Sequence, residues 1–157
     1  MRITFLVIAL ALAAPAMAQH QPPPGLDPST FTFKPLPERQ DVVSWKVLSQ
    51  VELVRQKDRY VAQFSSNVTA LNKKEVKVQG FMLPLQMGDK QTHFVLTAMP
   101  QTCSFCMPGG PESMVEVKSK MPVKYTFDII VLTGKLEVLK DDPTGVFYRL
   151  TEATQSN

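Results

Sequence analysis

Two segments with the same pattern limit what this chain can fold into. Residues 76–81 and 130–136 each place apolar side chains at alternating positions and lead into a glycine, Gly80 or Gly134, in mid-segment. Alternation with a period of two is typical of a strand with one buried face. A glycine inside a strand permits the sharp coiling that closure of a small barrel requires. The pattern therefore predicts strands that bend into a barrel.

Other segments carry the same alternation. They predict a hairpin over 51–64 and strands at 76–83, 93–98, 114–117, 126–139 and 146–150. Short helices are predicted at 42–48, capped by Asp41, and at 66–72, starting at Ser66 or Asn67. We therefore expect an all-β fold with one or two short helices. Its predicted form is a small, partly open β-barrel of the oligonucleotide/oligosaccharide-binding (OB) type, with a β-sandwich as the alternative.

The N-terminus has the three parts of a secretory signal peptide. Arg2 supplies the positive charge, residues 5–14 are apolar, and Ala16-Met17-Ala18 fits a small-x-small cleavage site. The apolar run is far shorter than the roughly 20 residues that a transmembrane helix needs. We therefore expect an exported protein, periplasmic in a bacterium, that does not insert into a membrane after signal cleavage.

Composition divides the chain into four parts. After the signal peptide at 1–18, a proline-rich run at 19–40 is typical of an extended tether or of an arm on the domain surface. Residues 41–152 are predicted to form a single barrel domain, and 153–157 a disordered tail. Loss of Arg2 with the signal peptide leaves 17 − 1 = 16 basic side chains against 14 acidic ones. This near balance does not call for nucleic acid or an anionic membrane as a partner.

Both cysteines of the chain lie in one loop between predicted strands. The loop reads Cys103-Ser104-Phe105-Cys106-Met107-Pro108-Gly109-Gly110-Pro111-Glu112. An oxidising compartment favours a disulfide between two such thiols when no metal is bound. Residues 99–114, here called the Cys loop, and the turn at 84–93 together form the predicted working surface.

Five segments resemble a known family. They are Gly80-Phe81-Met82-Leu83-Pro84-Leu85, His93-Phe94-Val95-Leu96, the Cys loop, Met114-Val115-Glu116-Val117 and Thr133-Gly134-Lys135-Leu136. In these segments the chain is similar to an exported bacterial domain-of-unknown-function family, number 3299. Relatives are often encoded beside ABC-type transporter components, and some lie in metal-responsive gene clusters. The resemblance thus implies a periplasmic accessory role, with inner-membrane ABC transporter components as candidate partners. Many relatives carry one cysteine followed by a histidine and prolines, whereas Phe105 and Cys106 stand here, so the resemblance carries a ligand role only to Cys103.

The first hypothesis for the cysteine pair is a soft metal site. A Cys-x-x-Cys turn can direct the thiolates of Cys103 and Cys106 at one zinc or copper ion. A closed zinc site needs four ligands, so a second chain or other side chains would have to complete it. The candidates are His93, Glu112 and Glu116 for zinc and the thioethers of Met107 and Met99 for copper(I).

Two alternatives remain open. A disulfide between Cys103 and Cys106 would pin the loop through its shape, because so small a ring gains little loop entropy. The protein-interaction loop would then comprise Pro108, Gly109, Gly110, Pro111 and Glu112. A thiol–disulfide redox role would need a helix at the first cysteine, which Pro108 and the Gly-Gly pair oppose. The sequence has no phosphate-binding loop, nucleophile elbow or zinc-protease motif, so we expect a binding protein and not an enzyme.

Overall fold

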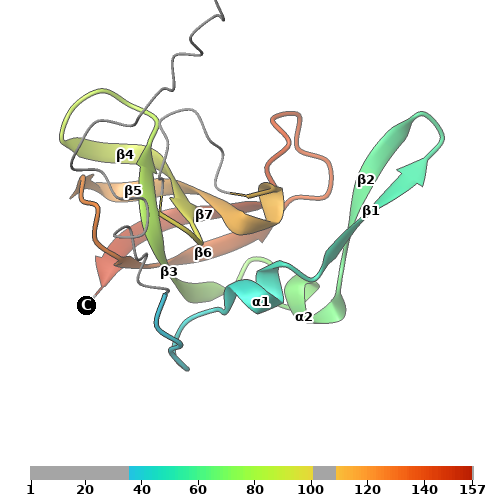
Figure 1. Ribbon diagram of the computed structural model, residues 1–157, viewed down its shortest axis with the longest axis horizontal. Coiled ribbons are helices and arrows are strands. Elements are labelled where there is room, and N and C mark those ends of the chain that lie inside the picture. The colour runs from blue at the N-terminus through green and yellow to red at the C-terminus, as the bar shows by residue number, and fades with distance from the viewer. Residues whose placement is uncertain (1–35, 101–108, 157) are drawn as a thin grey trace, which may run out of the picture. The chain divides into compact units, whose positions relative to one another are not determined.

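The computed structural model describes residues 36–100 and 109–156, and within them the regular structure is mostly β (Figure 1). The elements in chain order are α1 (Trp45–Leu48), β1 (Val51–Gln56), β2 (Arg59–Phe64), α2 (Ser66–Thr69), β3 (Glu75–Pro84), β4 (Lys90–Thr97), the 3-10 turn η2 (Pro111–Ser113), β5 (Met114–Lys124), β6 (Ile130–Val138) and β7 (Tyr148–Ser156). Strands β1 and β2 form a separate antiparallel hairpin, and the other five strands form a closed barrel. The predicted all-β class with short helices is confirmed.

The barrel has the strand order β3-β4-β5-β7-β6, and pairing of β6 with β3 closes it. The pairing is antiparallel throughout except between β5 and β7, which run parallel. This Greek-key arrangement of five strands is that of the OB type and excludes the β-sandwich alternative. The barrel is closed rather than partly open, because the ten-residue strand β3 pairs with β6 along its first half and with β4 along its second.

Both glycines that predicted a bend lie where the barrel turns. Gly80 is the last β3 residue paired with β6, and the next residue begins the pairing with β4. A Cβ atom at Gly80 would lie 2.6 Å from the carbonyl oxygen of Thr97, closer than a side chain can approach. Gly134 lies at the register shift between β6 and β7, where a Cβ atom would lie 2.8 Å from the carbonyl oxygen of Thr151. Glycine is therefore required at both bends.

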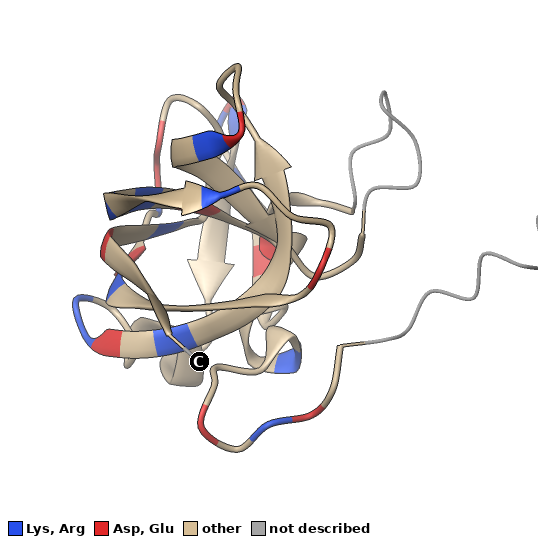
Figure 2. Ribbon diagram, turned by 90° about the vertical axis from the view of Figure 1, so that its left-hand side faces the viewer, with Lys and Arg blue, Asp and Glu red and all other residues tan. Residues whose placement is uncertain are grey.

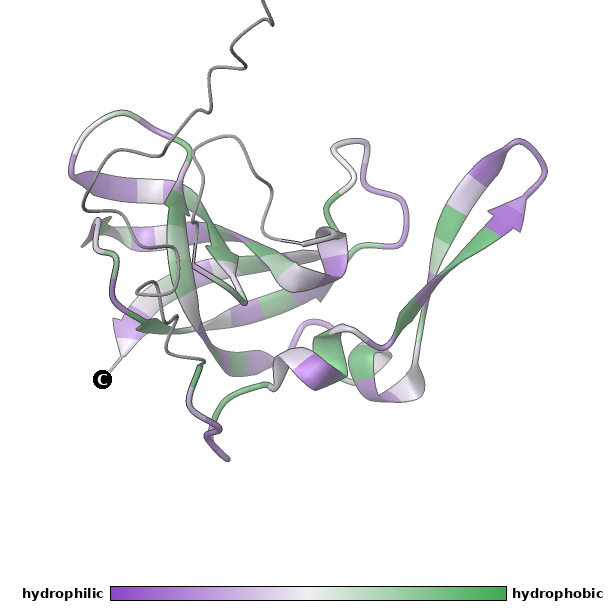
Figure 3. Ribbon diagram, viewed as in Figure 1, coloured by the Kyte–Doolittle hydropathy of each residue, from purple (hydrophilic) through white to green (hydrophobic). Residues whose placement is uncertain are grey.

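The core fills the barrel and continues beneath it. Hydrophobic and polar positions alternate along the barrel strands, as Figure 3 shows. Leu48 of α1 and Val68 of α2 are fully buried in the same cluster as the barrel residues, and Ala62 and Phe64 at the base of the hairpin are buried in it too. The Tyr148 hydroxyl donates to the carbonyl oxygen of Leu48, which ties β7 to α1. The two helices and the base of the hairpin thus pack against the barrel and share its hydrophobic core.

Three local predictions were wrong. The helix predicted at 42–48 starts later, because the hydroxyl of Ser44, and not Asp41, accepts the capping bond from the Lys46 N–H group. The second helix starts at Ser66 as predicted, with Ser65 as its cap, but it ends at Thr69 and not at Asn72. The predicted disordered tail at 153–157 belongs to β7 as far as Ser156, because antiparallel pairing with β6 satisfies its polar backbone and Ala153 is buried.

The predicted signal peptide at 1–18 and most of the proline-rich run at 19–40 lie outside the described residues. The end of that run is described and contacts the barrel, because the side-chain amide of Gln79 donates to the carbonyl oxygen of Pro37. In the described part of the chain, no helix is long and apolar enough to cross a membrane.

Candidate functional site

Four ionisable side chains meet on the outer surface of the barrel. His93 comes from β4, Glu116 from β5, Arg149 from β7 and Asp142 from the loop between β6 and β7. We call these four residues the charged cluster. Side chains alternate along a strand, so the residues beside these point inward. The buried neighbours are Phe94, Val115, Val117, Tyr148 and Leu150.

The members of the charged cluster are joined by short contacts. The Nε2 atom of His93 lies 2.8 Å from Oε1 of Glu116, and the Nε–H group of Arg149 donates to Oε2 of Glu116 at 2.6 Å. The Nη2 group of Arg149 also donates to Oδ2 of Asp142 at 3.1 Å. The Glu116 side chain is only 13% exposed, whereas that of His93 is 42% exposed. The cluster therefore has a shielded centre and one histidine at its rim.

Two opposing effects set the charge of Glu116. Burial raises the pKa of this carboxyl, but hydrogen bonds from Arg149 and His93 outweigh burial and leave the pKa below its usual value. The pKa of Asp142 is also lowered, first by hydrogen bonds from the hydroxyl and backbone of Thr144 and then by Arg149. Burial lowers the pKa of Arg149, but its two carboxylate partners outweigh this and raise it. Both carboxylates are thus held ionised beside a fixed cation.

The cluster orients the imidazole of His93. Glu116 occupies the Nε2 side of the ring, and the Nδ1 atom makes no hydrogen bond within the described residues. Histidine that binds a metal commonly gives its other ring N–H group to a carboxylate, which fixes the tautomer and the ring orientation. The pair His93–Glu116 has this form. It can therefore present one nitrogen lone pair to an ion or to a hydrogen-bond donor.

Strand directions place Asp142, Arg149 and Glu116 toward the Cys-loop end of the barrel, with His93 midway along β4. β4 ends and β5 begins at that end, and the Ala98 N–H group donates to the carbonyl oxygen of Ser113 across the base of the loop. Because β7 runs parallel to β5, the loop 139–147 before β7 lies at the same end. The turn 85–89 precedes β4 and lies at the opposite end, so within the predicted 84–93 part of the working surface His93 is nearer to the base of the Cys loop than the turn is.

The structure tests only part of the predicted site. Cys103, Cys106, Met107 and Pro108 lie outside the described residues, so their metal, redox and disulfide roles stay predictions. Within 36–100 and 109–156, no three His, Cys, Asp or Glu side chains are grouped so as to hold a metal ion. His93 and Glu116 would thus need further ligands from outside these residues.

The described end of the predicted interaction loop is a compact turn. Gly109 has a φ of 97°, and Gly110 precedes the 3-10 turn formed by Pro111, Glu112 and Ser113. The Ser113 N–H group donates to the carbonyl oxygen of Gly110 at 2.9 Å. These residues therefore form an ordered turn that directly precedes β5, and Glu112 is half-buried in it.

Two members of the charged cluster were not predicted. Asp142 was assigned to a turn, which it forms through its bonds to Thr144, but it also binds Arg149. Arg149 lies 33 positions from Glu116 along the chain, and only the parallel pairing of β5 with β7 makes them neighbours. The only sequence signal for Arg149 was its place between two apolar residues. That pattern predicts that the side chain points outward but does not predict which residue it binds.

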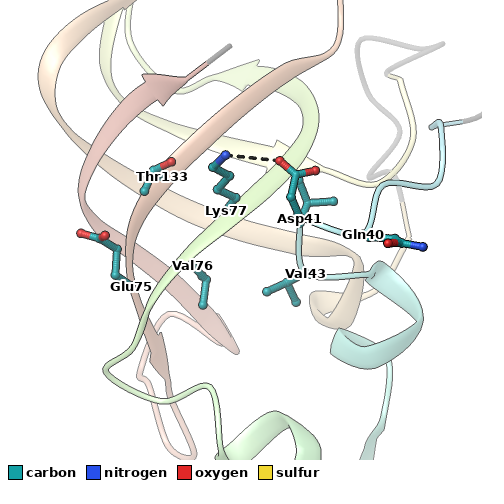
Figure 4. Close-up of a pocket in the computed structure, with 8 residues that line it drawn as sticks. Gln40, Asp41, Val43, Glu75, Val76, Lys77 and Thr133 are labelled. Atoms are coloured by element: carbon teal, nitrogen blue, oxygen red, sulfur yellow. Dashed lines mark hydrogen bonds and ion pairs between the residues drawn. The ribbon is translucent and has the colours of Figure 1, made fainter.

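A separate pocket of about 470 Å³ lies between residues 40–43, the start of β3 and Thr133 (Figure 4). In the close-up, Lys77 and Asp41 point toward each other across it, with Nζ 3.2 Å from Oδ2. Asp41 also accepts from Arg39, and the hydrogen bonds from Arg39 and Lys77 hold the pKa of this carboxyl far below its usual range. Asp41 and Lys77 thus bind one another, and Glu75 lines the same pocket without an ion-pair partner among the described residues.

A second hollow, of about 690 Å³, runs along residues 36–46 and includes Trp45, Gln79 and Ala98. The buried amide of Gln79 donates from Nε2 to the carbonyl oxygen of Pro37, which identifies its other atom, Oε1, as the oxygen. Oε1 has no hydrogen-bond partner among the described residues.

Comparison with known proteins places the chain in a family without assigning it a function. Residues 25–153 match the family described as "Protein of unknown function (DUF3299)". The crystal structure of a DUF3299 family protein from Pseudomonas aeruginosa PAO1 is similar with a TM-score of 0.48 and 21% identity, over 61% of this chain and 68% of that one. A search of curated proteins found no match. Because the family match extends over most of its length, the chain belongs to the DUF3299 family.

Proposed function

We propose that this protein is an exported, non-enzymatic accessory protein that binds a soft metal ion, zinc or copper(I). Cys103 and Cys106 supply two thiolates and the Nδ1 atom of His93 supplies a third ligand. Met107 adds a thioether when the ion is copper(I). The protein serves a transport system of the cell envelope, with inner-membrane ABC transporter components as its partners.

One observation carries the proposal: Glu116 holds the Nε2 side of the His93 ring and leaves the Nδ1 side open. Arg149 holds Glu116 in turn, so the ring has a second layer of support of the kind that tunes metal ligands. His93 stands four residues before the end of β4, a distance of about 13 Å along a strand. Cys103 is five positions after Ala98, a stretch of chain that can extend about 17 Å, so its thiolate is within reach of this ring.

The direct test is native mass spectrometry of the reduced mature protein, purified without a histidine tag and loaded with zinc or copper(I). We expect one ion per chain, which the double variant Cys103→Ser/Cys106→Ser loses. His93→Gln should weaken binding about 10- to 100-fold, as loss of a ligand or of its support does. His20→Gln is the matched control, because His20 is the only other histidine in the chain. No bound ion, or equal retention by the double cysteine variant, would contradict the metal function.

Thiol counting separates this proposal from its alternative, an interaction module shaped by a Cys103–Cys106 disulfide. Protein taken directly from the periplasm should have free or metal-protected thiols if the pair binds metal, and none if the pair is oxidised. Cell fractionation tests export. Cross-linking to the membrane components of a transporter tests the partner class, and the double serine variant should lose this contact only if metal is required for it.

A further inference from the structure

Exposed apolar side chains gather at the end of the barrel away from the Cys loop. Seven large hydrophobic side chains are exposed within the described residues, and four of them belong to the turn before β4 and to the end of β5 with the residues after it. We call these four the apolar tip: Leu85, Met87, Met121 and Phe127. Met87 is 99% exposed and Phe127 83%. Single exposed hydrophobic residues are ordinary, but four at one end of a small domain are a candidate interaction site.

The two segments of the apolar tip are held side by side. Lys90 at the start of β4 is the pairing partner of Lys124 at the end of β5. The Tyr125 N–H group donates to the carbonyl oxygen of Asp89 at 2.7 Å, and the rings of Tyr125 and Phe127 lie 5.2 Å apart. The turn that carries Met87 and the segment that carries Phe127 therefore form one surface.

The exposure of Met87 is built into the turn. The side chain of Gln91 is fully buried and binds the turn from inside, since its amide nitrogen donates to the carbonyl oxygens of Gln86 and Gly88. Its amide oxygen accepts from the Gln86 N–H group. Gly88 has a φ of 102°, which makes the turn sharp. The backbone on both sides of Met87 is thus fixed, and the thioether points into solvent.

Basic side chains lie just behind the apolar tip. Segments 85–93 and 118–128 contain four lysines and two aspartates, a formal balance of +4 − 2 = +2. The lysines are Lys90, Lys118, Lys120 and Lys124. Lys120 has a carboxylate partner at 3.7 Å, a weak exposed contact with Glu152. Figure 2 turns this end of the barrel toward the viewer and shows basic positions on the strands around it, with acidic positions interspersed.

We propose that the apolar tip is a peripheral docking surface for an anionic lipid bilayer. Met87 and Phe127 enter the interface between headgroups and acyl chains, and the lysines behind them meet the lipid phosphates. An anionic bilayer presents this same order of chemistry, with negative charge at its surface and hydrocarbon beneath. Side chains that project from two turn tips suit such a soft surface better than a rigid protein surface, which would need a matching groove.

This docking leaves the other end of the barrel free. The apolar tip and the Cys loop adjoin opposite ends of β4, whose eight residues span about 25 Å. Docking through the tip would therefore leave the base of the Cys loop, at the other end of β4, away from the lipid. The contact needs only side chains and no membrane-spanning segment. It is independent of the proposed metal function, and so are its tests.

Vesicle cosedimentation tests the proposal on the mature protein. We expect binding to vesicles of phosphatidylethanolamine with phosphatidylglycerol, weaker binding as salt is raised, and little binding to phosphatidylcholine alone. Met87→Gln/Phe127→Gln should bind at least about tenfold more weakly, since half-burial of one large apolar side chain is worth about that factor. The matched control is Leu53→Gln/Tyr60→Gln, which removes two exposed large hydrophobic residues from the hairpin and should bind as the parent does.

A second measurement reports the contact itself. The chain has one tryptophan, Trp45, so the difference spectrum between Phe127→Trp and the parent isolates a new indole at the tip. Its emission should shift to the blue on addition of anionic vesicles, whereas Tyr60→Trp on the hairpin should show no shift. Absence of vesicle binding at low salt would overturn the proposal. This result is also the one expected if the apolar tip binds an acidic protein and not a lipid bilayer. Equal binding by the two double variants, or no shift for Phe127→Trp, would also overturn it.

Discussion

Glu116→Gln should destabilise the fold through loss of one charge at the centre of the charged cluster. Glu116 accepts a 2.6 Å bond from Arg149 and is only 13% exposed. A hydrogen bond to a charged group is worth about 1.5–3 kcal/mol. Glutamine keeps one acceptor oxygen, and Arg149 keeps its hydrogen bond to Asp142. The loss of unfolding free energy should therefore stay below the ~3–5 kcal/mol that is lost when a buried charge is left fully unpaired. The contact with the more exposed His93 adds little. We expect a loss of about 1–3 kcal/mol.

Urea denaturation at neutral pH measures this loss as a shift of about 1 M in the midpoint, with an unchanged slope. Glu137→Gln is the matched control. Glu137 stands opposite Arg149 in the register of β6 with β7, yet it forms no hydrogen bond or ion pair with it in the described structure. It should cost less than about 0.5 kcal/mol. If both substitutions shift the midpoint equally, the argument from specific contacts is refuted.

The difference in stability between the parent and Glu116→Gln should also depend on pH. The pKa of Glu116 is lower in the folded than in the unfolded protein, so its contribution is complete above its unfolded pKa of about 4.5. The contribution is lost as the pH falls through the lower folded pKa. The stability gap between the parent and Glu116→Gln should therefore be constant from pH 7 to about 5 and shrink below that. A gap that widens on acidification would show that the sign is wrong.

Three further outcomes are expected. Gly80→Ala should lower the free energy of unfolding by about 1–3 kcal/mol in thermal or urea denaturation, because the new Cβ would lie 2.6 Å from the Thr97 carbonyl oxygen. The control Thr154→Ala, on an exposed part of β7, should leave the free energy of unfolding nearly unchanged. Tyr148→Phe should cost about 1–3 kcal/mol, since it leaves the Leu48 carbonyl oxygen without its buried donor. In a spectrophotometric titration, one of the three tyrosines should ionise well above the others and be missing in Tyr148→Phe, because burial raises the pKa of that phenol.

The fold was largely predictable because its signals are local. Alternating apolar residues identify strands wherever one face is buried, and Gly80 and Gly134 identify the bends because no other residue fits there. Local signals failed where two residues offered the same chemistry. Ser44 took the capping role expected of Asp41, whose carboxylate is bound by Arg39 and Lys77 instead.

Strand ends were less predictable for a different reason. The end of β7 is polar and resembles a tail, yet the backbone bonds of a ladder do not depend on side-chain polarity. Pairing of Ser156 with Val131 therefore continues the strand past the predicted boundary. A partner strand decides where such a strand ends, and the partner is distant in sequence.

The sequence by itself determined which residues face the core, where the barrel bends, and that both thiols share one loop. Each of these follows from a residue's own shape or from its immediate neighbours. Only the tertiary structure decided that Arg149 holds Glu116 and thereby His93, and that Met87 and Phe127 share one surface rimmed by lysines. The physical reason is that strand pairing joins residues 33 or more positions apart, and register, which no short segment encodes, selects the partners.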